Sequence, residues 1–489
     1  MKTLFKFLFI GLLMLVIALV INTHFYVPKE QNIPQPISIE INTDTVKNRL
    51  AEVLRFKTIS NQDRSLFDAT AFQQMHDFLE SSFPLLFSSL EKERVNQHSL
   101  LFTWKGKNPS LKPILFLAHQ DVVPVPDENL PSWTHPPFDG VIDEDYIWGR
   151  GALDDKSSLT GILEAVTFLL KEGFQPERTI YLGFGHDEEI FGTQGAAKIA
   201  ELLTQRGVKL EFVLDEGGVI ADGITPGIEP AVAMVGIAEK GFLSLKLSVI
   251  VQGGHSSMPP KHTAVGIISQ AIVNLEANPF PANSSHSMIF FDTVGPHMSY
   301  SKRLIFANYW LFKPLMESQF EKNKVTNSMI RTTTAATMFD SGIKDNVLPV
   351  SAEAVVNFRI LPGETVESVK QYVTQVINNP AIKVTGNGLN PSGISNTNSA
   401  SFKLLTETIH QANGSGRPLI VAPYLVMGGT DSRNFEGLTN NIYRFLFNYA
   451  NPDDVKRIHS IDERISIENY VKVIRFYYQL MKNSDSLGT

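Results

Sequence analysis

Residues 114–121 read Ile-Leu-Phe-Leu-Ala-His-Gln-Asp, an apolar stretch that ends directly in a histidine and an aspartate. The same arrangement occurs twice more, in Ile180–Phe184 before His186-Asp-Glu-Glu189 and in Phe212–Leu214 before Asp215-Glu216. Short apolar strands that alternate with amphipathic helices are typical of an α/β domain with a largely parallel sheet. Ligands of such sheets bind at the carboxyl ends of the strands, so the sequence predicts a site of acids and imidazoles there.

The number of acids at these strand ends favours a metal site. A fourth loop, Gly149–Lys156, adds Asp154 and Asp155 in front of a predicted helix. Each acid taken alone is explained as well by a helix cap or a solvated loop. So many carboxylates at one sheet edge would repel one another without a cation. Because the chain contains no cysteine, any metal ligands must be histidine, aspartate or glutamate.

Two short patterns indicate how such a site could be built. In His119-Gln-Asp121 both side chains lie on one face of an extended segment, so Asp121 can orient the imidazole toward a metal. Adjacent Glu188 and Glu189 point to opposite sides if the chain is extended there. One of them can then bind metal while the other acts as general base. An acidic pair that opens a helix is the ordinary alternative.

The composition is that of a globular protein of several domains. The 489 residues suggest two or three domains, and 43% of them are hydrophobic, which is enough for a sizeable core. The net charge is −7, and no basic run suited to a phosphate backbone occurs. We therefore expect no nucleic-acid partner.

The N-terminus predicts export. Lys2 and Lys6 accompany an apolar run over residues 4–21. No small-x-small cleavage site follows, which favours an uncleaved membrane anchor that holds the protein on the periplasmic or extracellular face. Secretion after signal cleavage and a buried core helix are the alternatives. The proline-containing residues 28–42 predict an extended spacer.

The motifs together resemble a known enzyme family. They run in order through His119-Gln-Asp121-Val-Val-Pro124, Trp148-Gly-Arg-Gly-Ala-Leu-Asp154-Asp155-Lys156, Asp187-Glu-Glu189, Gly253-Gly-His255, Asn346-Val-Leu-Pro349, Gly428-Gly-Thr-Asp431-Ser-Arg433 and His459. Their order and spacing are similar to those of the di-zinc metallopeptidase family of aminoacylase, carboxypeptidase S and succinyl-diaminopimelate desuccinylase. The segment 294–314 makes the chain look closest to the carboxypeptidase S and N-fatty-acyl-amino acid synthase/hydrolase branch.

The resemblance implies a fold and a domain plan. We expect a discontinuous α/β catalytic domain with a mostly parallel central sheet and an inserted α+β lid of the dimerisation type. With the anchor at residues 1–27 and the linker at 28–43, the catalytic domain would occupy 44–239 and 364–489, and the lid 240–363.

The resemblance also implies a metal centre. His119, Asp154 and Asp215 would bind one zinc ion, while Asp154, Glu189 and His459 would bind a second, with Asp154 as the bridge. Cobalt or manganese could substitute for zinc. The family pattern further implies a cis peptide bond between Asp154 and Asp155.

The remaining residues carried over from the family concern catalysis and substrate. Glu188 would act as general base on a metal-bridging water, Asp121 would orient His119, and His255 would stabilise the oxyanion. Asn346, Arg359, Gly429 and Thr430 would contact the substrate. The implied reaction is hydrolysis of the amide next to a free carboxylate in peptides or N-acyl amino acids, with reversible synthesis as an extension. A lid salt bridge is the ordinary alternative for Arg359.

Three questions stay open at this stage. The family contains dimers in which the lid histidine serves the neighbouring active site, as well as single-chain members with an enlarged lid; we favour the homodimer. A non-catalytic metal-binding protein on the same fold, or a hydrolase that uses a carboxylate pair without metal, are the competing functions. The apolar residues 304–315 could form a wall for a long acyl chain or a buried lid helix.

Overall fold

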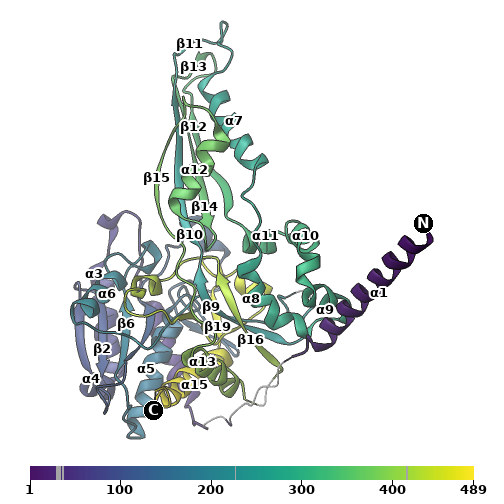
Figure 1. Ribbon diagram of the computed structural model, residues 1–489. Coiled ribbons are helices and arrows are strands. Elements are labelled where there is room, and N and C mark those ends of the chain that lie inside the picture. The colour runs from purple at the N-terminus through teal and green to yellow at the C-terminus, as the bar shows by residue number, and fades with distance from the viewer. Residues whose placement is uncertain (29–34, 36–37, 226, 415–416, 489) are drawn as a thin grey trace.

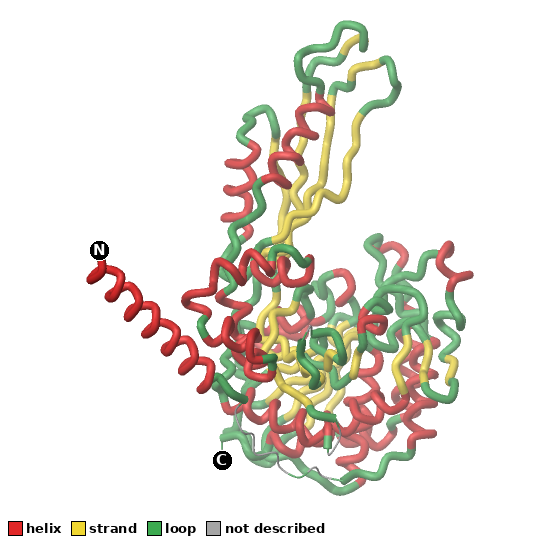
Figure 2. Tube along the Cα trace, turned by 90° about the vertical axis from the view of Figure 1, so that its right-hand side faces the viewer, coloured by secondary structure: helices red, strands yellow, loops and turns green. Residues whose placement is uncertain are grey.

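The computed structural model describes residues 1–28, 35, 38–225, 227–414 and 417–488 (Figure 1). The predicted spacer, residues 28–42, lies largely outside the described residues. Three parts stand apart in the two views: a broad catalytic domain, a long lid that rises from it, and the N-terminal helix α1 (Lys2–Phe25), which leaves the body at an angle (Figures 1 and 2).

A ten-stranded mixed sheet forms the centre of the catalytic domain. Its order is β1 (Glu91–Val95), β2 (Ser99–Trp104), β6 (Ile180–Gly185), β3 (Ile114–His119), β7 (Val213–Asp215), β17 (Ile442–Arg444), β9 (Ala231–Glu239), β8 (Ile220–Ala221) and β18 (Tyr449–Ala450), and β16 (Leu419–Val426) also pairs with β9. The strands β6, β3, β7 and β17 run parallel to one another. Their carboxyl ends therefore lie along one edge of the sheet, which confirms the predicted strands and gathers the predicted site residues that follow them at that edge.

Helices cover both faces of this sheet, so its strands are apolar on both sides. Phe116 packs into one apolar cluster and its neighbours Leu115 and Leu117 into another, as expected when successive side chains point to opposite faces. The first cluster is built with α2 (Thr43–Arg55), α3 (Ala69–Ser82), α4 (Pro84–Ser89), α5 (Lys156–Lys171), α13 (Ala400–Asn413) and α15 (Ile467–Ser484). The second is built with α6 (Ala196–Gln205).

The lid is a four-stranded antiparallel sheet with two helices on one face. The strand order is β12 (Thr333–Ser341), β14 (Ser351–Ile360), β10 (Gly241–Ile250) and β15 (Lys383–Leu389), and the helices are α7 (Ala264–Ala277) and α12 (Val366–Ile377). A two-stranded ribbon of β11 (Gly254–His255) and β13 (Val347–Leu348) forms the tip (Figure 1). The predicted lid end at residue 363 is wrong, because α12 packs on the lid core and β15 pairs with β10.

The segment between the lid strands also differs from expectation. We expected residues 283–324 to be part of the lid, but α8 (Ser285–Val294) packs against β16 of the central sheet, with Phe290 and Phe291 in the same cluster as Ile420. The helices α9 (Tyr300–Ala307), α10 (Tyr309–Phe320) and α11 (Lys324–Ile330) follow it. The chain therefore returns to the catalytic domain between α7 and β12.

A small three-stranded sheet joins two loops that lead to the site. It consists of β4 (Val141–Ile142), β5 (Tyr146–Trp148) and β19 (Arg464–Ser466). The short helix α14 (Pro452–Val455) precedes β19 in the chain. Because Arg464 pairs with Trp148, the loop after β5 is held next to the loop before β19.

Candidate metal centre

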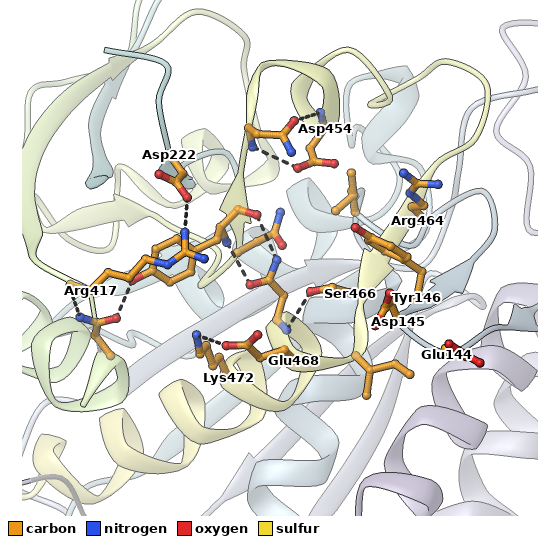
Figure 3. A pocket seen from close by; sticks show the side chains of 17 residues that line it. Glu144, Asp145, Tyr146, Asp222, Arg417, Asp454, Arg464, Ser466, Glu468 and Lys472 are labelled. Atoms are coloured by element: carbon orange, nitrogen blue, oxygen red, sulfur yellow. Dashed lines mark hydrogen bonds and ion pairs between the residues drawn. The ribbon is translucent and has the colours of Figure 1, made fainter. Parts of the chain in front are cut away.

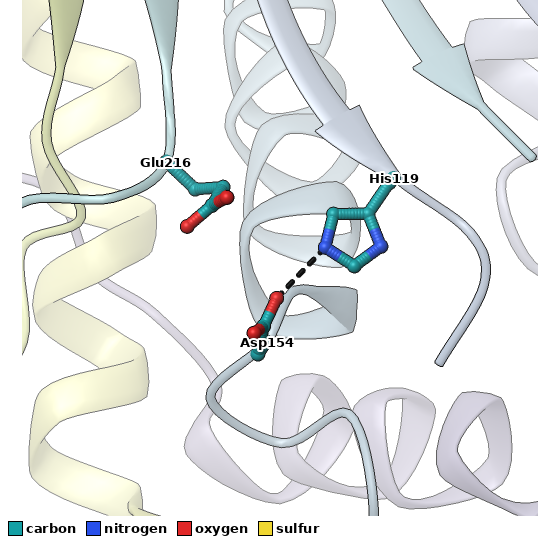
Figure 4. Close-up of side chains that lie close together, drawn as sticks. All are labelled: His119, Asp154 and Glu216. Atoms are coloured by element: carbon teal, nitrogen blue, oxygen red, sulfur yellow. Dashed lines mark hydrogen bonds and ion pairs between the residues drawn. The ribbon is translucent and has the colours of Figure 1, made fainter. Parts of the chain in front are cut away.

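Two groups of side chains that could each hold a metal ion meet at the carboxyl edge of the central sheet. His119, Asp154 and Glu216 form one group (Figure 4), and Asp154, Glu189 and His459 form the other. Within each group the ligand atoms lie within 4.8 Å of one another. Asp154 belongs to both: its Oδ1 lies 2.8 Å from His119 Nε2 and its Oδ2 lies 2.9 Å from His459 Nε2. This is the bridging arrangement that the family resemblance implied for Asp154.

Glu216 takes the place expected for Asp215. The Asp215 carboxylate accepts hydrogen bonds from the backbone N–H groups of Glu216 and Ser432, at 3.0 and 2.8 Å. It therefore ties β7 to the loop after β16 and is not gathered with His119 among the described residues. The sequence offers both acids as candidate ligands, since Glu216 follows Asp215 directly. Which of the two joins His119 depends on the contact between Asp215 and Ser432.

The loop that carries Asp154 is held in place by a buried ion pair. Arg150 Nη1 donates to Glu463 Oε2 at 2.6 Å, and both side chains are nearly inaccessible. Glu463 Oε1 accepts from the backbone N–H groups of Gly151, Leu153 and Asp154. The peptide bond between Asp154 and Asp155 is cis, as predicted. The motif Trp148-Gly-Arg-Gly thus serves to aim Asp154.

Asp121 organises the strand ends on the other side. Its carboxylate accepts hydrogen bonds from the backbone N–H groups of Glu188 and Glu189, both at 3.1 Å. Its backbone oxygen lies 2.9 Å from His119 Nδ1, which is closer than its carboxylate at 3.5 Å. Since carbonyl and carboxylate oxygens can only accept, Nδ1 donates to the Asp121 carbonyl and Nε2 donates to Asp154 Oδ1. A cation held between Nε2 and Asp154 would take the place of the second of these protons. Asp121 therefore orients His119, as predicted, chiefly through its backbone.

The electrostatics of the cluster fit a cation. Hydrogen bonds to Asp154 and Glu189 raise the pKa of His459 to about 10, so this edge of the sheet attracts positive charge. Burial raises the pKa values of Glu188 and Glu216 well above their usual range, and neighbouring carboxylates raise them further. Glu189 Oε1 is buried without a hydrogen-bond partner. Imidazole and carboxylate donors of this kind suit zinc and other borderline divalent ions.

A cleft of about 320 Å³ adjoins this cluster at the base of the lid. Glu188, Glu189 and His459 line it from the catalytic domain, and Arg359 lines it from β14. The guanidinium of Arg359 lies 5.0 Å from the centre of the Phe242 ring, and its side chain is exposed to solvent. Gly429 and Thr430 also line the cleft. Thr430 Oγ1 is occupied by a 2.8 Å hydrogen bond to Glu239.

Sequence reasoning missed several residues of this cleft. Phe191, Phe242 and Leu389 give it an apolar wall. Residues 304–315, for which such a wall and a buried lid helix were the two alternatives, do not line it. Lys240, between β9 and β10, is a further basic side chain of the cleft beside Arg359 and Arg433, and its Nζ donates to the backbone oxygens of Ser328 and Arg331 at 2.8 Å. A lone lysine between two apolar strands was a signal in the sequence.

Two predicted site residues lie far from the cluster. His255 and Asn346 are exposed on the tip ribbon, where the backbone N–H of Ser256 donates to Asn346 O (Figure 1). Strand β10 runs from Phe242, opposite Arg359, to Ile250 near the tip, which corresponds to roughly 27 Å at about 3.4 Å per residue. His255 thus does not reach the metal centre of its own chain.

A separate polar cavity of about 550 Å³ lies on the catalytic domain (Figure 3). Its charged side chains pair with one another: Arg417 with Asp222, and Lys472 with Glu468. Arg464 stacks on the Tyr146 and Trp148 rings. Neither ligand group of the metal centre lines this cavity, so the cleft below the lid is the candidate active site.

A mixed α/β sheet with an inserted lid, and two adjoining groups of histidine and carboxylate ligands at its carboxyl edge, define a metal-dependent hydrolase. The chain belongs to peptidase family M20/M25/M40, whose model matches residues 115–483. This confirms the resemblance found in the sequence.

Known proteins of this kind are similar along nearly the whole chain. The probable carboxypeptidase S-like 2 of Dictyostelium discoideum is 40% identical over 99% of this chain and 94% of its own. The N-fatty-acyl-amino acid synthase/hydrolase PM20D1 of Xenopus tropicalis is 40% identical over 99% and 96%. The crystal structure of the M20 family metallo-carboxypeptidase Sso-CP2 from Sulfolobus solfataricus shares the fold, with a TM-score of 0.65 and 19% identity over 90% of this chain and 99% of that one.

Proposed function

We propose that this enzyme hydrolyses the amide bond next to a free carboxylate in peptides or N-acyl amino acids, with two zinc ions at the metal centre. The observation that carries the proposal is the cleft below the lid, because Glu188 and Arg359 face it together with Glu189 and His459. Relatives named as a carboxypeptidase S-like protein and as an N-fatty-acyl-amino acid synthase/hydrolase support the same substrate class. Synthesis is the reverse of this reaction.

The residues at the metal centre divide the chemical work. His119, Asp154 and Glu216 would hold one ion, and Asp154, Glu189 and His459 the other. Ions bound there supply Lewis acidity and lower the pKa of water at the site. Glu188, which lines the cleft beside Glu189, would take the proton from the attacking water and pass it to the departing amine. Cobalt or manganese can satisfy the same ligands.

Arg359 would fix the substrate by its carboxylate. Its guanidinium lies on the cleft side of the lid sheet, where the Phe242 ring packs against its face. No carboxylate among the described cleft residues forms an ion pair with it. A bidentate contact with a free carboxylate would place the neighbouring amide between Arg359 and the base. The apolar wall of Phe191, Phe242 and Leu389 suits an aliphatic or aromatic group beside that amide.

His255 and Asn346 would act on the cleft of a second copy. Both lie on the lid tip, roughly 27 Å or more along the lid from Arg359, so service within one chain is not supported. The exposed edge strand β12 is a suitable surface for pairing two lids, because its outer backbone groups have no partner strand among the described residues. The active enzyme would then be a homodimer with shared sites.

The helix α1 would hold the enzyme at a membrane. Its 24 residues are long and apolar enough to cross a bilayer, and no residue of the apolar window is buried in the protein. The catalytic domain would face the periplasmic or extracellular side. Secretion after cleavage of this segment is the competing arrangement.

The substrate assignment is tested by comparing an N-acyl-phenylalanine with its C-terminal amide. We expect the amide to lose at least ~100-fold in kcat/KM, because a carboxylate contact in a desolvated site is worth roughly 3 kcal/mol. Arg359→Met should remove most of this discrimination. Lys246→Met changes a cation on the same lid sheet that pairs with Glu353 outside the cleft, and should keep it. Equal hydrolysis of acid and amide by the unmodified enzyme would contradict the proposal.

A further inference from the structure

Helix α10 exposes an apolar stripe that no described residue covers. Trp310, Leu311 and Leu315 are 62%, 39% and 49% accessible, and Pro314 between them is exposed as well. Positions three and four residues apart are neighbours on a helix surface, so Pro314 lies next to both Trp310 and Leu311, and Leu315 lies next to Leu311. The four side chains therefore form a continuous stripe. An exposed stripe of this kind usually contacts another surface.

The stripe lies next to the candidate membrane helix. Helix α9 stands beside the C-terminal end of α1, and α10 follows α9 in the chain (Figure 1). The buried Asn308, between α9 and α10, donates from Nδ2 to Leu19 O at 3.1 Å and accepts from Asn22 Nδ2 at 3.0 Å. Arg303 of α9 donates to Thr23 O at 3.3 Å. These contacts fix α9 and α10 relative to α1.

The position of these contacts along α1 sets their depth in a membrane. Leu15, Leu19 and Thr23 are the least exposed residues of α1, and their spacing of four places them on one face, which is turned to the protein. At 1.5 Å per residue, Leu15 lies about 9 Å inside the end of the apolar run at Ile21. If Leu15–Ile21 left the bilayer, residues 4–14 would span about 16 Å, roughly half of the hydrocarbon thickness.

The chemistry around the stripe suits a lipid surface. Tyr300 and Trp310 are exposed aromatic side chains, of the kind enriched where membrane and water meet. Cations are in excess over residues 300–324, where Lys302, Arg303, Lys313, Lys322 and Lys324 stand against Glu317 and Glu321. Apolar side chains flanked by lysine and arginine are typical of helices that lie in the interface of an anionic bilayer.

We propose that α9 and α10 form a second membrane contact, in which the stripe Trp310, Leu311, Pro314 and Leu315 enters the interfacial layer of the bilayer that α1 spans. The inference rests on the proposed anchor role of α1. It assigns these four side chains to lipid and not to an acyl-chain wall of the cleft. Two contacts would fix the orientation of the enzyme, whereas one helix would let it rotate.

Trp310 is a built-in probe for this contact. The chain has four tryptophans, and Trp104, Trp133 and Trp148 are all under 9% accessible. The full-length protein would be reconstituted in vesicles of phosphatidylcholine and phosphatidylglycerol whose acyl chains are brominated or not. We expect bromine to remove about half or more of the Trp310 fluorescence, defined as the difference between the unmodified protein and Trp310→Phe. The fluorescence of Trp310→Phe should change little.

Two variants and a flotation assay complete the test. Leu311→Gln with Leu315→Gln should reduce the quenching, while Ile343→Gln, which changes a 94% exposed residue outside α9 and α10, should leave it unchanged. Flotation with the vesicles tests the anchor separately, because it requires α1 alone. Protein that floats but shows no quenching of Trp310 overturns the proposal. Trp310 emission that changes only with protein concentration would assign the stripe to a second copy and overturn it too.

Discussion

Candidate catalytic residues lie in two regions, the metal centre and the lid tip, and these regions differ in how firmly they hold the side chains. At the metal centre, Asp154 is aimed by Glu463, and Glu188 is aimed by Asp121, through buried hydrogen bonds. At the tip, His255 is exposed, and its Nδ1 lies within hydrogen-bond distance of the hydroxyl and the backbone N–H of Ser257, two residues along the chain. All residues of the metal centre come from one chain. The residues of the tip can take part in the reaction only at the cleft of a second chain.

The sharpest test of the metal centre is Glu188→Gln. We expect kcat to fall by about 10³-fold or more, because the variant cannot take up a proton, while the metal content stays at two ions per chain. The measurement is turnover of an N-acyl amino acid together with elemental analysis. Glu172→Gln, at a surface carboxylate that binds Tyr478, is the matched control and should keep full activity. Unchanged turnover in Glu188→Gln would remove this region from the chemistry.

The exchange of Asp215 for Glu216 gives a second test. Glu216→Gln should lower metal content from two ions toward one and reduce kcat by roughly 10²-fold, because it removes a ligand of the His119 group. Asp215→Asn should retain both ions, since its carboxylate accepts backbone hydrogen bonds instead. The Asp215→Asn substitution should instead destabilise the protein, which would be measured as a lower Tm. The reverse pattern of metal loss would restore Asp215 as the ligand.

Lys240 tests the joint between the two regions. Burial and, to a smaller extent, the nearby charge of Arg359 lower its pKa to about 7. Because its pKa is lower in the folded state than in the unfolded chain, the unfolded state binds more protons above pH 7, and stability gains from this group as pH rises toward 10. Between pH 7 and 9, the free energy of unfolding of the unmodified protein should therefore rise relative to that of Lys240→Met, by at most about 1.4 kcal/mol per pH unit. Denaturant unfolding at several pH values measures this, and a constant gap would contradict it.

Much of the fold and of the metal centre was predictable because it follows from local patterns. The apolar runs before His119, Glu188 and Asp215 predict strands without any knowledge of the neighbouring strands. The carboxyl ends of parallel strands must then lie at one edge of the sheet. The bridging place of Asp154 and the cis bond after it were implied by the resemblance of the surrounding motif to the metallopeptidase family.

The rest depended on contacts between distant segments. Glu216 and not Asp215 meets His119 because Ser432, far along the chain, binds Asp215. The lid extends to Leu389 because β15 finds an edge of β10, which its own alternating, glycine-containing sequence does not reveal. Similarly, the apolar residues of α8 fit either sheet, and only packing on β16 assigns them to the catalytic domain. The distance from His255 to the cleft is a property of the assembled lid.

The central claim, that the tip of one chain completes the cleft of another, is tested by mixing two inactive variants. Glu188→Gln and His255→Ala should each be inactive alone, the latter by about 10²-fold. After subunit exchange of equal amounts, half of the dimers are mixed, and each of these has one cleft with Glu188 served by an intact His255. Activity should return to about a quarter of the unmodified enzyme. Subunit exchange shown by mass spectrometry without any return of activity would contradict the claim.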